Sequence, residues 1–329
     1  MSLEYGRNGK HHMITQVVII GAGIAGLVCA RRLADAGIAP IVLDKGRGVG
    51  GRMATRRVVV AGTQLQFDHG AQYATVRDSV FRELLNGVAD ACAIWKDGAN
   101  TPHFVGVPAM SSIPRAIAAG LDVHYGVEVT ALKSAGSGWV VEAGADSYTA
   151  AQVVMAVPAP QAAVLLGYGD PLVERLQTVV MEPCLTLMAA FSPTAPRPFI
   201  SRMDETLPLA WIAQDSSKPG RATALTTWVA QASPAWSAMH IEADRPTIAL
   251  RMLPLLCAAI GASPDSVRHS AAHRWRFARV KIPLGQPFLR NENGTLYLGG
   301  DWCLGARIEA AWASGNAIAN DILKTRHVG

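Results

Sequence analysis

Charge, aromatic residues and cysteine are all scarce in this chain of 329 residues, and each scarcity excludes a class of protein. Charged residues make up 17% and aromatic residues 6%, while 50% are apolar, so a disordered or collagen-like chain is excluded and a large core is expected. The net charge is only +5 and no polybasic run occurs, which argues against nucleic acid as a partner. A slightly positive field suits an anionic small molecule.

The five cysteines predict a reducing, cytoplasmic location. They are widely spaced, odd in number and form no C-x-x-C, so neither a disulfide framework nor a cysteine zinc site is expected. The histidines show no metal-binding spacing, and no G-x-S-x-G hydrolase motif is present. We therefore expect no bound metal.

The beginning of the chain contains one apolar stretch, over 14–30, that resembles a short membrane span. Three glycines interrupt it and no cleavage site stands out, so export and membrane insertion are disfavoured. Residues 1–14 are polar and include His11 and His12. We expect them to form a flexible leader or tag-like segment outside the fold.

Residues 15–44 predict a β-α-β unit that binds a dinucleotide. A β-branched strand over 15–20 runs into Gly21-x-Gly23-x-x-Gly26, a helix pattern follows, and a second strand ends at Asp44. The first glycine permits the tight turn, the second lets a pyrophosphate approach the helix N-terminus, and the third lets helix and strand pack closely. A carboxylate at Asp44 accepts from a ribose hydroxyl. The fingerprint alone does not separate NAD from FAD.

The rest of the chain shows two different sequence patterns. Proline, tryptophan and alternating apolar residues over 161–267 predict an antiparallel sheet with helices, whereas the two ends of the chain follow the β-α-β style. We expect strands over 121–130, 139–142, 151–158 and 295–298, and helices over 77–90, 245–260 and 309–324.

Several further segments resemble the flavin-containing amine oxidase superfamily. Gly50-Gly51-Arg52-Met53 is similar to its G-G-R loop, which crosses the pyrophosphate and whose arginine pairs with phosphate. Residues 298–315 resemble its C-terminal flavin motif, and residues 67–73 resemble the segment that passes the flavin ring. Val129 matches the strand valine that meets the adenine, and Ala156 matches the end of the A-x-P strand.

The resemblance implies non-covalent FAD in an α/β protein: a Rossmann-like FAD-binding domain with a second substrate domain on a mainly antiparallel sheet. The FAD-binding domain would comprise residues 15–76, 108–160 and 268–329, and the substrate domain residues 77–107 and 161–267. Asp301 would approach ribityl or pyrophosphate oxygens. The helix that starts near Ile308 would direct its N-terminus at flavin N1 and the C2 carbonyl, where reduction places negative charge.

The expected cofactor-binding residues come from the fingerprint and the resemblance together. They are Gly21, Gly23, Ile24, Ala25, Gly26, Asp44, Lys45, Gly51, Arg52, Met53, Gly70, Ala71, Gln72, Val129, Ala156, Asp301, Arg307, Ile308, Glu309 and Ala310. His69 and Arg307 are the candidate catalytic residues, although the flavin itself would carry the chemistry.

Within this superfamily the chain resembles the renalase family, especially its bacterial members. Its length, its D-H-G-A-Q-Y segment, residues 273–278 and its G-G-D-W sequence carry the resemblance. Renalases oxidise 2- and 6-dihydro isomers of NAD(P)H to NAD(P)+, transferring a hydride to flavin N5 and passing electrons to O2 with release of H2O2. Two alternatives stay open: a flavin-containing amine oxidase acting on a primary or secondary amine, and a non-catalytic FAD-binding redox sensor.

Two departures from typical amine oxidases disfavour a simple amine. Residues 181–188 contain no lysine to hold a water at flavin N5. Arg307 occupies the position of an aromatic-cage tyrosine, and Ala310 replaces a glycine. A cation is a poor wall for a protonated amine, whereas it suits an anionic substrate.

Other polar and aromatic residues have two interpretations each. His69 could position a substrate amide or, as we favour, hydrogen-bond its own loop. Residues 273–279 alternate basic with aromatic side chains and could recognise phosphate or form the solvated face of a strand. Tryptophans that could stack on a nicotinamide, but that more often lie in a core, are Trp211, Trp228 and Trp236.

Overall fold

A computed structural model describes residues 2–5 and 11–326 of the chain. The chain divides into two compact units, each built from separate segments. Unit 1 comprises residues 1–51, 114–180 and 280–329, and unit 2 comprises residues 52–113 and 181–279. The boundaries of the units differ from those of the predicted domains chiefly at residues 52–76 and 268–279, which lie in unit 2, and at residues 161–180, which lie in unit 1.

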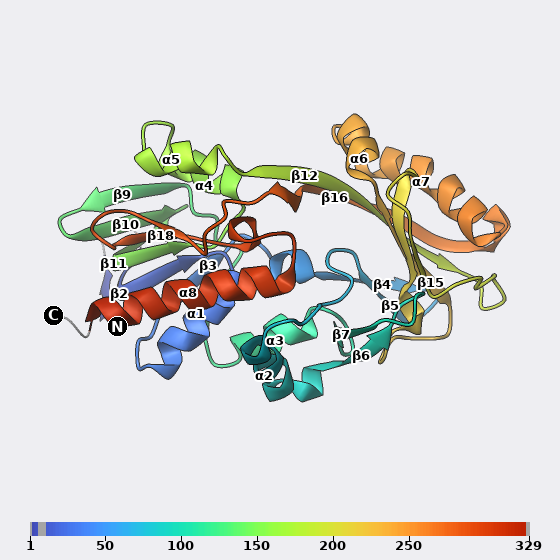
Figure 1. The fold of residues 1–329 in the computed structure, drawn as a ribbon, viewed down its shortest axis with the longest axis horizontal. Helices are drawn as coiled ribbons and strands as arrows, with labels where there is room; N and C mark the ends of the chain where they lie inside the picture. Colours follow the sequence, from blue (N-terminus) through green and yellow to red (C-terminus); the bar gives the residue numbers. More distant parts are fainter. Residues whose placement is uncertain (1, 6–10, 327–329) are drawn as a thin grey trace. The chain divides into compact units, whose positions relative to one another are not determined.

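Unit 1 is built on a nine-stranded sheet with a parallel centre (Figure 1). Val17, Val18 and Ile19 are all fully buried, so both faces of the central strand are covered, as an unbroken apolar run predicts. The parallel strands lie in the order β18 (Leu296–Leu298), β11 (Asp146–Met155), β2 (His11–Ile20), β3 (Ile41–Asp44) and β8 (Asp122–Tyr125).

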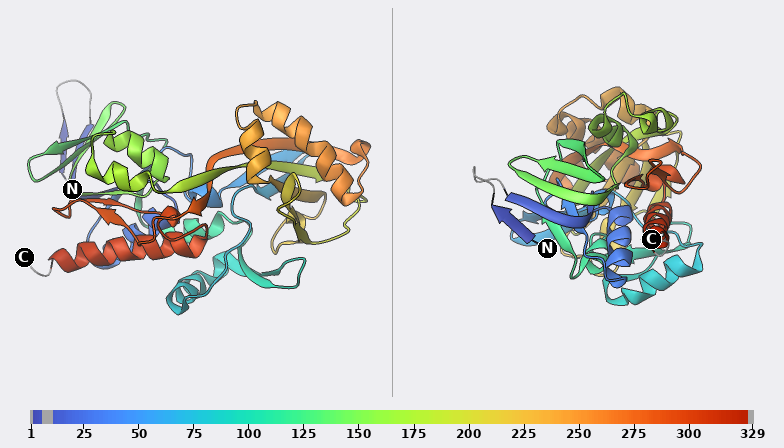
Figure 2. Two further views of the ribbon diagram at one scale, coloured as in Figure 1. Left: turned by 45° about the horizontal axis from the view of Figure 1, so that its top comes forward. Right: turned by 90° about the vertical axis from the view of Figure 1, so that its left-hand side faces the viewer.

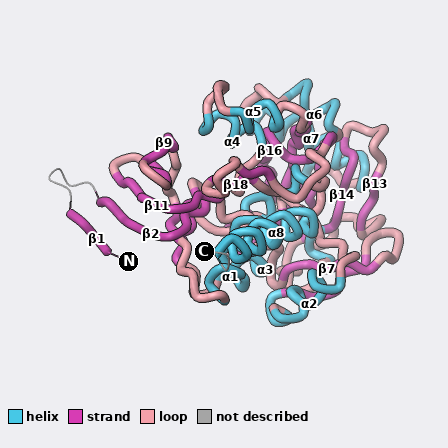
Figure 3. Tube along the Cα trace, turned by 60° about the vertical axis from the view of Figure 1, so that its left-hand side comes forward, coloured by secondary structure: helices cyan, strands magenta, loops and turns pink. Residues whose placement is uncertain are grey.

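Antiparallel strands and helices complete unit 1. Figures 1, 2 and 3 show α1 (Ile24–Asp35) and α8 (Ile308–Arg326) side by side. Their close packing requires Gly315, since a Cβ there would lie 2.1 Å from the Ala25 carbonyl oxygen. The other elements are β1 (Ser2–Tyr5), β9 (Ala131–Ala135), β10 (Gly138–Ala143), β17 (Leu289–Arg290), α4 (Ala159–Leu166) and α5 (Pro171–Leu176), with α3 (Ser112–Ala118) spanning the unit boundary.

Two sequence expectations for unit 1 were wrong in part. Residues 11–14, expected in a leader, extend β2 because β11 continues alongside and pairs Thr149 with Ile14, while β1 pairs with the other edge. Residues 1 and 6–10 of the expected leader lie outside the described residues. The strand expected over 121–130 ends at Tyr125, because Gly126 takes a φ of 69° and turns the chain.

Unit 2 contains a five-stranded sheet with helices on one face. Its strands lie in the order β13 (Ser201–Met203), β14 (Leu209–Gln214), β15 (Thr226–Ala232), β12 (Val180–Phe191) and β16 (Val267–Ile282). Figure 2 shows α6 (Pro234–His240) and α7 (Arg245–Ile260), in orange, over this face. Buried residues of β12, β14, β15 and α7 form its main core.

The ends of α7 follow from local chemistry. The Asp244 side chain accepts from the Thr247 amide at 2.7 Å, which caps the first turn, and Gly261 ends the helix with a φ of 68°. The remaining elements of unit 2 are the hairpins β4 (Thr55–Val60) with β5 (Thr63–Asp68) and β6 (Cys92–Lys96) with β7 (Pro102–Gly106), and the helix α2 (Ser79–Gly87).

Strand β16 separates two layers of unit 2. Ala272 belongs to the core that includes α7, whereas Ala271 packs against a second apolar cluster that contains Leu65 and Phe67 of β5. The hairpin β4–β5 therefore covers the sheet face opposite the helices. This packing explains why residues 52–76 belong to unit 2.

Candidate functional site

The glycine fingerprint lies between β2 and α1, as the sequence predicts. Gly21 has a φ of 106°, and a Cβ at Gly26 would lie 2.0 Å from the Gly21 carbonyl oxygen and 3.2 Å from Ala156 Cβ. Packing therefore requires the first and third glycines. A Cβ on Gly23, at the N-cap of α1, would meet nothing within 4 Å. The open approach to this helix N-terminus fits a phosphate group.

Asp44 joins the two loops at this end of unit 1. Its carboxylate accepts from the amides of Ala22 and Gly46, each at 2.6 Å. The Gly50 amide donates to the Ala22 carbonyl at 2.8 Å, and a Cβ on Gly51 would lie 3.6 Å from Gly23 Cα. Since each carboxylate oxygen can accept more than one hydrogen bond, Asp44 still fits a ribose hydroxyl.

The C-terminal motif lies in unit 1 as well. The Gly299 amide donates to the Met155 carbonyl at 3.0 Å, and the Gly300 amide donates to Ser314 Oγ at 2.9 Å. These bonds fix the end of β18 against β11 and α8. Asp301 follows and is buried, and α8 begins at Ile308, within one residue of the prediction. Arg307, just before the helix, is exposed.

The predicted cofactor residues divide between the units. Lys45 is exposed and lies 3.7 Å from Glu128, while the Arg52 guanidinium donates to the Ala278 carbonyl at 3.1 Å. Unit 2 holds Arg52, Met53, Gly70, Ala71 and Gln72, and unit 1 holds Gly21, Gly23, Ile24, Ala25, Gly26, Asp44, Lys45, Gly51, Val129, Ala156, Asp301, Arg307, Ile308, Glu309 and Ala310.

The loop over residues 68–73 is fixed through its own backbone. Gln72 Nε2 donates to the carbonyls of Asp68 and Gly70, and Gln231 Nε2 donates to the Gly70 carbonyl at 2.7 Å. Trp275 Nε1 donates to the His69 carbonyl at 2.8 Å. Three successive carbonyls are thus bound by side chains, which hold the backbone of the loop in place.

A buried charge cluster of Asp68, Asp215, Lys218 and Arg221 lies beneath this loop. Lys218 Nζ lies 2.8 Å from Asp215, 3.2 Å from Asp68 and 3.2 Å from Gln72 Oε1. Arg221 pairs with Asp68 and donates to the Gly106 carbonyl at 2.9 Å. All four side chains are buried, and their charges balance. Although burial raises the Asp68 pKa, Lys218 and Arg221 bring it below its ordinary value.

His69 and His273 form a neutral pair beside the loop. Their ring centroids lie 4.6 Å apart, and the Nδ1 atom of each is buried without a hydrogen-bond partner among the described residues. Burial, together with the nearby Arg56 charge, lowers the His69 pKa to about 4. Burial lowers the His273 pKa to about 3, helped by the charges of His69, Arg245 and Arg56. Both imidazoles are therefore uncharged at neutral pH.

Three arginines of β16 have partners within unit 2. Arg274 donates to the Ile241 carbonyl at 2.8 Å, Arg276 pairs with Glu242 at 2.6 Å and Arg279 pairs with Glu205 at 3.2 Å. These contacts favour the interpretation of a strand with a solvated face. Of the three tryptophans, Trp228 is fully buried in the core and Trp236 packs against it, whereas Trp211 lies 5.6 Å from the Tyr73 ring.

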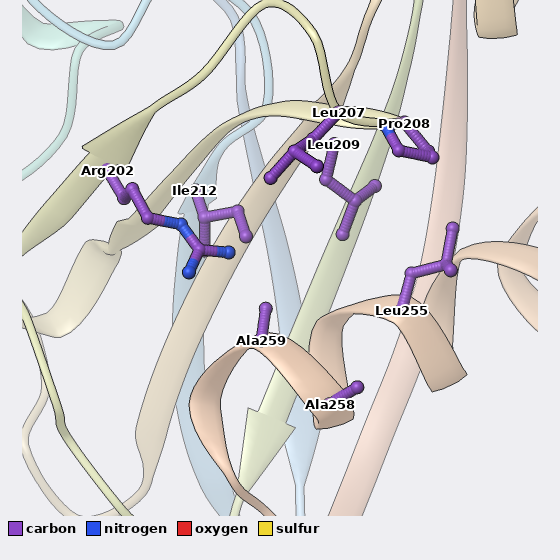
Figure 4. Close-up of a pocket in the computed structure, with 8 residues that line it drawn as sticks. All are labelled: Arg202, Leu207, Pro208, Leu209, Ile212, Leu255, Ala258 and Ala259. Carbon is purple, nitrogen blue, oxygen red and sulfur yellow. The ribbon is translucent and has the colours of Figure 1, made fainter.

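Unit 2 also has a largely apolar cavity of about 300 Å³ (Figure 4), and no residue of the loop over 68–73 lines it. Arg202 is its charged lining residue, and the Arg202 guanidinium lies 5.1 Å from the Phe199 ring. None of the predicted site residues lines this cavity. The lining residues are Arg202, Leu207, Pro208, Leu209, Ile212, Leu255, Ala258 and Ala259.

Models of two known protein families together match nearly the whole chain. Residues 19–87 match the model of a NAD(P)-binding Rossmann-like domain, and residues 81–323 match the model of the flavin containing amine oxidoreductases. The chain belongs to the flavin-containing amine oxidoreductase family. It is therefore a flavoprotein oxidoreductase with FAD as its cofactor, which confirms the predicted fold class and cofactor.

Solved structures share this fold at low sequence identity. A protein of Exiguobacterium sp. 255-15, provisionally assigned as a protoporphyrinogen oxidase, is 12% identical with a TM-score of 0.76, over 94% of this chain and 98% of that one. Putrescine oxidase bound to putrescine is 14% identical (TM-score 0.66, 95% and 100%). Cyclohexylamine oxidase from Brevibacterium oxydans IH-35A is 14% identical (TM-score 0.65, 95% and 99%).

Two features are missing from the part of the chain that the structure describes. None of its helices is long and apolar enough to cross a membrane. No group of three or more His, Cys, Asp or Glu residues there could hold a metal ion.

Proposed function

We propose that this flavoenzyme oxidises 2- and 6-dihydro isomers of NAD(P)H to NAD(P)+, with O2 as electron acceptor and H2O2 as product. The observation that carries the proposal is the lack of a strong proton acceptor among three basic side chains at this loop, Lys218, His69 and His273. Lys218 is held by two carboxylates, and both His69 and His273 have pKa values of about 4 or lower. A fourth, His103, stacks on Tyr73 and is already hydrogen-bonded through Nε2 to Asp97 at 2.9 Å.

This lack separates the two candidate substrate classes. An amine is protonated in neutral solution and must lose that proton before it can be oxidised, and an imidazole with a pKa of about 4 is a poor acceptor for it. A dihydropyridine ring becomes aromatic on losing hydride, so it needs no side-chain base. When bound, FAD would supply the hydride acceptor at N5 and the route of the electrons to O2.

The chain's own residues would bind FAD and orient the substrate beside it. In unit 1, the α1 N-terminus at Gly23 and the Asp44 carboxylate are the proposed sites of pyrophosphate and ribose. In unit 2, the fixed loop over residues 68–73 is the proposed neighbour of the flavin ring. The exposed cation Arg307 is the proposed contact for an anionic group of the substrate.

One observation favours an amine oxidase instead. Tyr73 stacks on His103 at 3.8 Å and lies 5.6 Å from Trp211, so an aromatic wall does exist in unit 2. Such a wall can attract a cation. This second candidate would act on a primary or secondary amine.

Anaerobic bleaching of the flavin's visible bands decides between them. One sample receives mixed 2-, 4- and 6-dihydro isomers of NAD, and another receives primary amines and polyamines. We expect rapid bleaching by the dihydronicotinamides alone, followed by H2O2 on readmitting air. Bleaching by an amine alone would replace the proposal with the second candidate. Arg307→Ala should raise KM for the dinucleotide, and an unchanged KM would remove its proposed role.

A further inference from the structure

The inner face of β16 meets the hairpin β4–β5. The His269 ring lies 6.0 Å from the Phe67 ring, and the His273 ring lies 4.6 Å from the His69 ring. Arg56 of β4 is directly opposite Phe67 in the antiparallel register, so both side chains project from the same face of the hairpin. Arg56 is therefore directed toward the layer that holds both imidazoles.

The polar groups of this layer are unsatisfied. Among the described residues, no hydrogen bond or ion pair reaches the Arg56 side chain, whereas Arg221, Arg276 and Arg279 each pair with a carboxylate. The His69 residue is only 4% exposed, and its Nδ1 atom has no partner. Buried polar atoms are almost always hydrogen-bonded, so an unpaired imidazole nitrogen next to an arginine without a carboxylate partner indicates a missing ligand.

The charges around the two imidazoles are mostly positive. Arg56 acts on both rings, and Arg245 acts on His273 from the N-terminus of α7. Asp68 is the one carboxylate that acts on His69, and Lys218 and Arg221 already neutralise it. The missing ligand should therefore be an anion.

We infer that Arg56, His69 and His273 form an oxyanion site in unit 2, which takes a phosphoryl group of the substrate. The guanidinium fork matches two phosphoryl oxygens, and the imidazoles supply further donors. That the phosphoryl group belongs to a dinucleotide rests on the proposed function, whereas binding of the anion itself does not. Arg307 of unit 1 is a separate proposed contact.

Calorimetric titration of the FAD-loaded protein with inorganic pyrophosphate tests the site directly. Arg56→Gln should weaken binding about tenfold or more, because a charge-assisted contact is lost. Arg56→Lys keeps the charge but lacks the planar guanidinium, so its affinity for pyrophosphate should lie between those of the parent protein and Arg56→Gln. The matched control is Arg276→Gln, an exposed arginine on the outer face of β16, which should bind pyrophosphate as the parent protein does.

Flavin content and thermal melting show whether each variant is folded. If Arg56→Gln does not fold, Arg56→Lys and His273→Asn carry the same test. No pyrophosphate binding to the parent protein, or equal binding to Arg56→Gln and the parent, would overturn the site.

The pH dependence of sulfate binding provides an independent readout. A bound anion favours the charged imidazole, so binding should be tighter at about pH 5 than at about pH 7. Sulfate stays a dianion over this range, so the change reports the protein. His273→Asn should reduce the pH dependence, and affinity that does not vary with pH in the parent protein would contradict the role of the histidines.

Kinetics separate this site from the proposed reaction. If dihydronicotinamides are oxidised, Arg56→Gln should raise KM with little change in kcat, and pyrophosphate should inhibit competitively. If no dihydronicotinamide is oxidised but pyrophosphate binding depends on Arg56, the proposed function fails and the oxyanion site stands. If oxidation occurs without that binding, the site fails and the function stands.

Discussion

Unit 1 positions its proposed cofactor residues mainly through close backbone contacts, whereas unit 2 adds side-chain hydrogen bonds to one such contact, that of Gly70 with the Arg52 carbonyl. In unit 1 the close contacts involve glycines, such as Gly26 against the Gly21 carbonyl and Gly315 against the Ala25 carbonyl. In unit 2 the carbonyls of the loop over residues 68–73 are bound by Gln72, Gln231 and Trp275. A close backbone contact tolerates no added atom, while a buried charge cluster tolerates no lost partner.

The two constructions also differ in how far apart their parts lie in the chain. The glycine fingerprint spans six consecutive residues, so its members are already close together in the chain before the protein folds. Lys218 and Asp68 are 150 residues apart, and they meet only when the sheet and the hairpin have packed. The buried charges cost solvation, which their mutual contacts must offset.

The largest effect should come from removing one charge of the buried cluster. Lys218→Met leaves Asp68 and Asp215 with Arg221 as their one cation in the cluster, and unfolding in urea should show a loss of about 3–5 kcal/mol. The double variant Lys218→Met/Asp215→Asn restores the charge balance and should recover part of this loss. A single variant as stable as the parent would show that side-chain charge does not hold unit 2 together.

The next largest effect should come from adding one methyl group in unit 1. Gly26→Ala places a Cβ 2.0 Å from the Gly21 carbonyl oxygen, so α1 must shift, at a cost of about 3 kcal/mol. We expect the purified protein to lack flavin absorbance.

The matched control for Gly26→Ala is Gly23→Ala, whose Cβ would meet nothing within 4 Å. Its stability should stay within about 0.5 kcal/mol of the parent. Its affinity for FAD should nevertheless fall, because the methyl group occupies the approach to the helix N-terminus. Unchanged FAD affinity in Gly23→Ala would contradict the proposed pyrophosphate position.

A smaller effect is expected from acid. His69 and His273 have folded-state pKa values of about 4 and about 3, below the ordinary 6.5. Between the folded-state pKa and 6.5, each histidine therefore binds more protons in the unfolded chain than in the folded protein. Stability from this pair is present above pH 6.5 and is lost as pH falls toward 4. Melting temperatures across this range should fall less steeply for His273→Phe than for the parent. Equal slopes would show that the pair is not neutral in the fold.

The smallest effect should come from the outer face of β16. Arg276 and Glu242 are 47% and 75% exposed, so water screens their contact. We expect the melting temperature of Arg276→Gln to match that of the parent within error, at low and at high salt. A clear loss of stability would mean that surface charges in unit 2 matter as much as buried ones.

Local signals account for the elements that the sequence predicted well. The helix expected over 245–260 has those bounds in the structure, because Asp244 and Gly261 mark its ends within the sequence itself. The strand and helix around the glycine fingerprint are equally local. The extension of β2 to His11 was missed because it depends on β11, which is more than a hundred residues away in the chain.

The oxyanion site was only half visible in the sequence. The sequence marks His69 as a loop residue and His273 as part of a basic stretch. Nothing near Arg56 in the chain marks this arginine of β4 as unpaired. Its relation to the imidazoles follows from the packing of β4–β5 against β16.

The sequence by itself determined the family, the cofactor and the β-α-β fingerprint, because their signals lie in short runs of residues whose geometry is set by neighbours. The tertiary structure alone decided which charges are buried together and which remain unpaired. Asp68, Lys218, Arg56 and His273 come from distant segments. Electrostatic interactions depend on distance through space and on burial, and neither can be read along the chain.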